Sequence, residues 1–222
     1  MKYHLNKNEP KEINGVKVYR IYADECFKTI DGEKIKTGTR GGWLESEDNL
    51  SQDSNCWVAD DAVVCGKARI HNSAVVRGKA RIQDAACIQG CALISGEAIV
   101  SDEANVFGHD IGNHYTVHVY GSAHISDYAE VYGESRVYEN AHICDEATIC
   151  GKSIIRGNAM VEGKGRVRDS IIKGNTKICG DTLVCIYASI SGGTIADSYI
   201  RGDAESCMSN KEQTFDEVFL NQ

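Results

Sequence analysis

From Val58 to Ile111 the sequence reads VADDAV VCGKAR IHNSAV VRGKAR IQDAAC IQGCAL ISGEAI VSDEAN VFGHDI, which divides into nine blocks of six residues. Every block begins with valine or isoleucine, and its third residue is glycine, aspartate or asparagine. The fifth residue is alanine in eight of the nine blocks. A period of six residues sustained over this length indicates a repeat architecture, in which each repeat stacks on the next.

The same period continues in the second half of the chain. It resumes at Val119 and places one aliphatic residue every six positions as far as Val167. The frame then slips by one residue at Ile172, and again at Ile195 and Ile200. We therefore expect a less regular end to the repeat array.

Each block predicts a short strand followed by a corner. Alternation in a strand places the aliphatic residue and the alanine on the inside, while the intervening residues face solvent. Glycine, asparagine and aspartate tolerate the left-handed backbone that a tight corner requires. Three blocks make one triangular coil, and parallel ladders about 4.8 Å apart join successive coils. We predict an all-β chain: a parallel β-helix of about eight triangular coils.

These blocks resemble the hexads of left-handed parallel β-helices in hexapeptide-repeat proteins. The segment GTRGGWLESEDNLS at residues 38–51, followed by NCWV at residues 55–58, is similar to the YdcK family of bacteria and prophages. In that family a G-x-x-G-G-W/F stretch leads into C-W-[IV] and then the helix. The resemblance covers residues 35–205 and implies a left-handed helix, although a six-residue period also fits a right-handed helix of the bactofilin kind.

The chain divides into a capping segment at residues 1–43, a repeat helix at 44–205 with a loop at 108–118, and a C-terminal tail at 206–222. Turn signals at Asn14-Gly15 and Asp31-Gly32 lie beside alternating stretches at residues 16–21 and 33–36. We expect these stretches to form short strands that cover the first coil, because an uncovered coil exposes unpaired strand edges.

Two further groups of residues belong to the ends of the helix. Trp43 and Trp57 are expected to fill the first coil. The tail carries Phe215, Val218 and Phe219 with helix-like spacing. We expect it to cap the other end of the helix or to pack on a neighbour.

Composition excludes several classes of function. Lys and Arg total 24 against 32 Asp and Glu, so the net charge of −8 disfavours nucleic acid as a partner. No apolar run reaches the roughly 20 residues of a membrane helix, and the start lacks an export signal, so we predict a cytoplasmic protein without membrane contact. The ten cysteines contain no C-x-x-C pair and are expected to be reduced filler residues.

One segment interrupts the rhythm and contains three of the seven histidines, His109, His114 and His118. Val106 and Val119 are thirteen residues apart, which leaves seven extra residues for a loop. Loops on rigid scaffolds often carry function. In many left-handed β-helix acyltransferases a loop histidine is the general base, so the resemblance makes these three histidines catalytic candidates with acetyl-CoA as the cofactor. No acyl-CoA segment or acceptor motif of that class is recognisable.

A zinc site is a weaker alternative for the same loop. His109 and His114 have the spacing seen in zinc-binding γ-class carbonic anhydrases, but His71 lies two positions from the place of the third ligand. The other partners expected in that class have no counterparts. We therefore predict no metal.

Outward residues eighteen positions apart should lie above one another on the prism. Val75, Leu93 and Ile111 form an apolar column of this kind, which predicts a subunit interface. A homotrimer is usual among the resembled enzymes and is our first expectation, with a dimer second. Tyr120 and Tyr138, and His124 and His142, also align; they form either ladders within a sheet or a shallow ligand-binding groove.

Three functions remain compatible with the sequence. We predict a non-catalytic binding or structural protein that acts on a partner such as a host protein, or holds a small ligand at subunit interfaces, without a cofactor. The alternative is a CoA-dependent acyltransferase of the hexapeptide-repeat class. Mimicry of DNA fits the acidic charge, but Lys67, Arg69 and Arg77 are among the basic residues that interrupt any acidic face.

Overall fold

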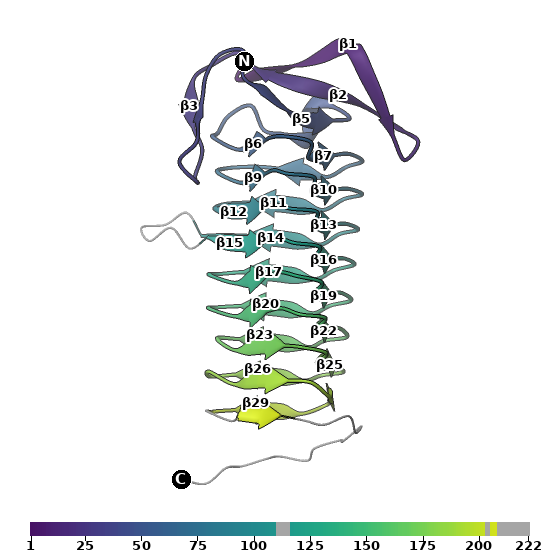
Figure 1. Ribbon diagram of the computed structural model, residues 1–222, viewed down its shortest axis with the longest axis vertical. Helices are drawn as coiled ribbons and strands as arrows, with labels where there is room; N and C mark the ends of the chain where they lie inside the picture. Colours follow the sequence, from purple (N-terminus) through teal and green to yellow (C-terminus); the bar gives the residue numbers. More distant parts are fainter. Residues whose placement is uncertain (110–115, 203–204, 208–222) are drawn as a thin grey trace.

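The computed structural model describes residues 1–109, 116–202 and 205–207, which form a three-sided parallel β-helix beneath an antiparallel cap (Figure 1). Each of eight successive coils contributes one short strand to each of three sheets, and these strands run parallel to their neighbours within a sheet. The second sheet contains eight strands, one from each of eight coils. The predicted stack of about eight coils is therefore confirmed, and its left-handed sense stays a prediction.

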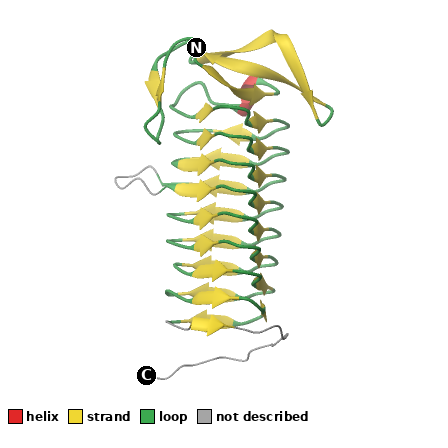
Figure 2. Ribbon diagram, in the orientation of Figure 1, coloured by secondary structure: helices red, strands yellow, loops and turns green. Residues whose placement is uncertain are grey.

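The strands within the coils are short. Figure 2 shows them alternating with corners along each coil. The first sheet contains β1 (Tyr3–Ile13), β2 (Val16–Ala23), β5 (Arg40–Leu44), β7 (Val63–Val64), β10 (Arg81–Ile82), β13 (Ile99–Val100), β16 (His124–Ile125), β19 (His142–Ile143), β22 (Met160–Val161), β25 (Lys177–Cys179) and β28 (Thr194–Ala196). The second contains β8 (Arg69–Ile70), β11 (Cys87–Gln89), β14 (Asn105–Phe107), β17 (Glu130–Tyr132), β20 (Thr148–Cys150), β23 (Arg166–Arg168), β26 (Leu183–Cys185) and β29 (Tyr199–Arg201). The third contains β6 (Trp57–Val58), β9 (Val75–Val76), β12 (Ala92–Ile94), β15 (Val117–Val119), β18 (Arg136–Val137), β21 (Ile154–Ile155), β24 (Ile171–Lys173), β27 (Ser189–Ser191) and β30 (Glu205–Cys207). A fourth, two-stranded sheet pairs β3 (Phe27–Lys28) with β4 (Lys34–Ile35), and one helical turn, η1, spans Glu47–Asn49.

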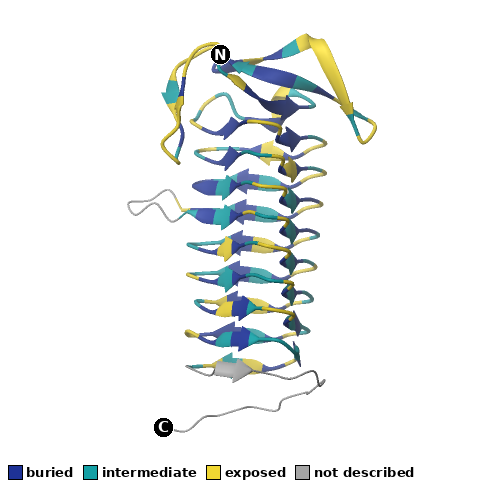
Figure 3. Cartoon of the chain, viewed as in Figure 1, coloured by how far each residue is buried: buried dark blue, intermediate teal, exposed yellow. Residues whose placement is uncertain are grey.

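The six-residue block behaves as its chemistry predicts. The third residue of the block has a positive φ of 55° to 59° at Asp60, Asn72, Asp84 and Asp102, so the corner is left-handed. The aliphatic residue and the alanine point inward and are buried, and Figure 3 shows buried positions recurring from coil to coil. A narrow aliphatic core thus holds every coil to the next, which is the main stabilising term of the fold.

An antiparallel hairpin closes the N-terminal end. β1 pairs with β2 through a turn at Asn14 and Gly15, and β2 pairs with β5, which in turn pairs in parallel with β7. The sequence predicts the strand at 16–21 but not β1, which contains Pro10. Proline is tolerated there because β1 is the outermost strand of its sheet and its register shifts before Pro10.

The G-G-W stretch is a packing requirement at the joint between cap and helix. A Cβ added to Gly41 would lie 2.6 Å from Trp57 Cζ2, and one added to Gly42 would lie 2.5 Å from Val58 Cγ1. Trp57 is completely buried in the main core cluster, but its pairing with Val75 places it on the outward side of β6. Trp43 packs in a separate cluster with Val18 and Val63, beneath the hairpin, so the expectation that it fills the first coil is wrong.

A second hairpin covers the outside of the third sheet near the cap. It carries β3 and β4 and lies beside the first coils in Figure 1. Arg77, just after β9, makes ion pairs with Asp31 (2.5 Å) and Glu33 (2.8 Å) of this hairpin, and the Phe27 ring lies edge-on to Trp57 at 5.5 Å. The outward side chain of Val75 is consequently completely buried.

The described residues bear on the state of the cysteines and on membrane-spanning helices. In that part of the chain, Cys26, Cys56, Cys65, Cys87, Cys91, Cys144, Cys150, Cys179 and Cys185 are free thiols, in agreement with the reduced state that we expect. No described helix has the length or the apolar character needed to cross a membrane.

Candidate functional site

The seven-residue insertion lies at one corner between the second and third sheets. Its two ends are joined by the backbone of Cys91, whose N–H donates to the Gly108 carbonyl at 3.2 Å and whose carbonyl accepts from the Val117 N–H at 3.2 Å. β15 then pairs with β12 in the regular parallel register. The insertion therefore leaves the ladder intact on both sides, and the predicted loop is shorter than residues 108–118 because β15 begins at Val117.

The three candidate histidines do not form one cluster. His109 is exposed directly after β14, and its ring lies edge-on to Phe107 with centroids 5.9 Å apart. His118 is a half-buried residue of β15 in the third sheet, where burial and then Arg136 lower its pKa. His114 lies outside the described residues.

A groove of about 390 Å³ lies beside the insertion, and we call it the loop-side groove. Its lining side chains come from the end of β14 and from three successive coils below it: His109, Tyr132, Glu134, Cys150, Lys152, Arg168 and Asp169. Of these, only His109 is a candidate site residue predicted from the sequence. The others lie in columns with a spacing of eighteen residues, so the rule that aligned Tyr120 with Tyr138 would also have aligned Tyr132, Cys150 and Arg168.

The charges in the loop-side groove are arranged with carboxylates inside and cations outside. Lys152 pairs with Glu134 at 3.5 Å, and Arg168 pairs with Asp169 at 3.3 Å. The two cationic side chains are 72% and 70% exposed, whereas the carboxylates are 34% and 31% exposed. Asp169 is also fixed by the Lys152 backbone N–H at 2.9 Å. Solvent-exposed pairs of this kind contribute little to stability, so the cations can turn toward a ligand at small cost.

The two weakly acidic side chains in the groove are held in their protonated forms. Burial raises the pKa of the Cys150 thiol, and burial together with Cys150 raises the pKa of Tyr132. Since the thiolate is the nucleophilic form of cysteine, Cys150 is not activated for attack at neutral pH.

The proposed interface column changes at the insertion. Val75, beneath the β3–β4 hairpin, is not an exposed contact surface, and half-buried Leu93 pairs with it in register. The next residue of this column is His118, because β12 pairs with β15 after the insertion. Ile111, eighteen residues after Leu93, falls within the insertion and outside the described residues. The sequence count fails here because it crosses the inserted residues.

The two aligned ring pairs are stacked. Tyr120 and Tyr138 have ring centroids 4.7 Å apart with planes within 3°, and His124 and His142 are 4.9 Å apart with the same angle. The tyrosines follow strands of the third sheet, whereas the histidines lie in β16 and β19 of the first sheet. The two pairs are thus ladders on neighbouring sides of the prism.

The histidine ladder predicts a dependence of stability on pH. Burial, followed by the neighbouring His142, lowers the pKa of His124, although Asp102 and Asp127 oppose the shift. Burial also lowers the pKa of His71 and His118. The unfolded chain therefore binds more protons once the pH falls below about 6.5. We expect the free energy of unfolding to be greatest above this pH and to fall as the pH is lowered toward 5.

Urea unfolding at several pH values between 5 and 8 checks this expectation. The matched variant is His124→Phe, which retains a flat ring above His142 and cannot bind a proton. Its unfolding free energy should vary less with pH than that of the wild type. A wild-type stability that is constant below pH 7, or an identical slope in the variant, would contradict the assignment.

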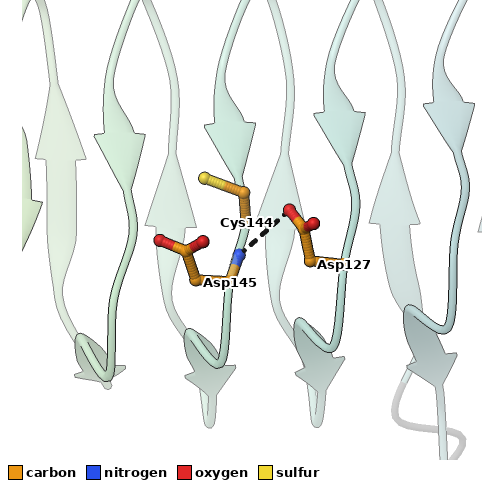
Figure 4. Close-up of side chains that lie close together, drawn as sticks. All are labelled: Asp127, Cys144 and Asp145. Atoms are coloured by element: carbon orange, nitrogen blue, oxygen red, sulfur yellow. Dashed lines mark hydrogen bonds between the residues drawn. The ribbon is translucent and has the colours of Figure 1, made fainter.

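The acidic corner between the first and second sheets holds a ladder of stacked aspartates. The backbone N–H of each next residue donates to the carboxylate above it, as from Asp127 to Asp102 (3.3 Å) and from Asp145 to Asp127 (3.2 Å). Figure 4 shows Cys144 beside the carboxylates of Asp127 and Asp145. The thiol sulfur and one oxygen of each carboxylate, which are atoms of the kind that bind metal ions, lie within 4.8 Å of one another. Burial and then Asp145 raise the pKa of Cys144 to about 11, so the thiol stays protonated at neutral pH. The ladder therefore has a structural explanation, as acceptors for the corner amides.

Comparison with known proteins adds no assignment to this geometry. No protein-family model matches the chain, and no curated protein matches it in sequence. The resemblance to the YdcK family thus stays a prediction that depends on the quoted motifs. The site has to be interpreted from its own residues.

Proposed function

We propose that this chain is a binding protein that holds a small ligand in the loop-side groove without chemical turnover. The observation that carries the proposal is the position of this groove: it adjoins the insertion that interrupts the regular coil between Gly108 and Val117. Regular coils supply a rigid support, and excursions from such supports are where binding residues concentrate. The groove combines an aromatic ring, a thiol and exposed cations, which are suited to recognition of a ligand.

The chemistry of the groove favours binding over catalysis. Covalent catalysis by cysteine needs a thiol with a lowered pKa, and that of Cys150 is raised. The carboxylates of Glu134 and Asp169 are already paired with Lys152 and Arg168. Among the described lining residues, the exposed His109 is the single imidazole, and it faces the ring of Phe107. These groups supply shape, stacking and charge.

Native mass spectrometry of the purified protein tests this proposal. We expect a trimer that retains a small ligand, and we expect Arg168→Glu to lose that ligand by replacing a cation of the groove with an anion. Arg69→Glu is the matched control, because Arg69 is an exposed residue of the same sheet outside the groove. A wild-type protein without any added mass, or equal retention by both variants, would contradict the proposal.

Acyl transfer is the second candidate, because His109 lines the groove as a loop histidine of an acyltransferase would. Its test is hydrolysis or transfer from acetyl-CoA in the presence of a panel of amine and hydroxyl acceptors. Turnover that is lost in His109→Ala at an unchanged melting temperature would support this candidate and overturn the binding-only proposal. We expect no turnover above the uncatalysed rate.

A further inference from the structure

A column of side chains in the second sheet changes character where it crosses the loop-side groove. It runs through Phe107, Tyr132, Cys150 and Arg168, which occupy equivalent positions in four successive coils. Phe107 and Tyr132 are stacked, with ring centroids 4.8 Å apart and planes within 13° of each other. The aromatic ladder stops there, because Cys150 supplies only a short side chain at the next level.

Cys150 thus leaves a place for a ring between two groups that stack on rings. Coils are about 4.8 Å apart, so Tyr132 and Arg168 are separated by roughly two such steps. A flat ring beside Cys150 would lie at about 4.8 Å from each, within the usual range for aromatic stacking and for a guanidinium over a ring. The Tyr120–Tyr138 and His124–His142 pairs, at 4.7 and 4.9 Å, show that this helix stacks rings at that interval elsewhere.

The rim of the groove adds a preference for charge. Lys152 and Arg168 are largely exposed, and among the described residues each has one carboxylate partner, at 3.5 and 3.3 Å. An ammonium has three N–H donors and a guanidinium has five, so both retain donors for an anionic group on a bound ring. The carboxylates are less exposed, and Asp169 already accepts the Lys152 amide, so the cations are the groups that a ligand meets first.

We infer that the loop-side groove binds a planar aromatic ring that carries a carboxylate or a similar anionic group. The ring stacks between Tyr132 and Arg168 over Cys150, and the anionic group binds Lys152 and the guanidinium edge of Arg168. This inference rests on the proposed function, since it assigns a ligand class to the same groove. No covalent step is involved.

Calorimetric or NMR titration of the purified protein with two matched probes tests the inference. The first probe is 2-naphthoate, and the second is decahydronaphthalene-2-carboxylate, which has a similar size and the same charge but no aromatic ring. We expect one equivalent of 2-naphthoate to bind, with an affinity at least about tenfold higher than that of the saturated probe. Cys150→Phe should abolish this binding by placing the protein's own ring in the vacant level, without lowering the melting temperature.

Two further variants keep the test informative. Arg168→Gln should weaken 2-naphthoate at least about tenfold, whereas Arg201→Gln should leave it unchanged, because Arg201 lies lower in the same column and outside the groove. Equal affinity for both probes would overturn stacking while leaving the groove as a binding site. Binding that survives Cys150→Phe, or a wild type that binds neither probe, would overturn the inference; a retained natural ligand in the native mass spectrum would then still support the proposed function.

Discussion

Replacement of Gly90 by alanine is expected to destabilise the protein by about 2–5 kcal/mol, through overpacking and a left-handed backbone together. Gly90 forms the corner after β11 with a φ of +62°, and an added Cβ would lie 1.8 Å from the Gly108 carbonyl oxygen. That oxygen accepts the Cys91 N–H, the bond that holds one end of the insertion. The backbone cannot move away from this contact without weakening the hydrogen bonds between two successive coils. Because the Gly108 carbonyl holds one end of the insertion, we also expect weaker ligand binding in the adjoining loop-side groove.

Gly15→Ala is the matched control for this substitution. Gly15 has a φ of +81° in the turn between β1 and β2, and an added Cβ would meet no atom within 4 Å. The control therefore carries only the conformational cost of about 1–2 kcal/mol. Urea unfolding of both variants separates the two contributions, and equal losses would show that the contact with Gly108 is not the cause.

Replacement of Lys2 by methionine is expected to lower the free energy of unfolding by about 3 kcal/mol, because charge-assisted hydrogen bonds contribute about 1.5–3 kcal/mol each and do not add fully. The Lys2 side chain enters the cap and is only 5% exposed. Its ammonium donates to the carbonyls of Ser51 and Ser54, both at 2.6 Å, and of Cys56 at 3.0 Å. Methionine retains the apolar stem, leaves these three acceptors without their donor, and should loosen the cap.

Lys7→Met is the control, because Lys7 is an exposed residue of β1. It should change the unfolding free energy by less than about 0.5 kcal/mol, as surface substitutions usually do. Hydrogen exchange at residues 51–56 supplies a second measurement, since the amides of this segment should exchange faster in Lys2→Met alone. Equal stability and equal exchange in both variants would mean that the buried ammonium is not what closes the first coil.

The β-helix could be predicted from sequence because its contacts are periodic. Every six-residue block specifies the same inward residue and the same left-handed corner, so Val64, Ile82 and Val100 could be placed in the core without knowledge of distant contacts. The outward side chains of Tyr120 and Tyr138 could be aligned for the same reason. Because each coil contacts only its neighbours, the strands of all three sheets could be predicted from the same repeat.

The sequence-based predictions fail where residues outside the six-residue repeat pack against the helix or interrupt it. Burial of Val75 depends on the β3–β4 hairpin, which Arg77 fixes through carboxylates more than forty residues earlier in the chain. The column of Leu93 passes to His118 because the insertion adds residues at a corner and none to a strand. The loop-side groove was missed because its residues are unremarkable one by one, and only their stacking in register beside His109 makes a site.

The way in which the insertion is joined has a consequence for how such proteins diversify. Both of its ends are tied to the backbone of one residue, Cys91, and the ladder continues unchanged below it. Segments of different length or composition could therefore be exchanged at this corner while every rung keeps its partners. The inserted loop can therefore vary independently of the helix, by natural selection or by protein engineering. Ligand specificity can change in this way while the strand pairing of the fold stays the same.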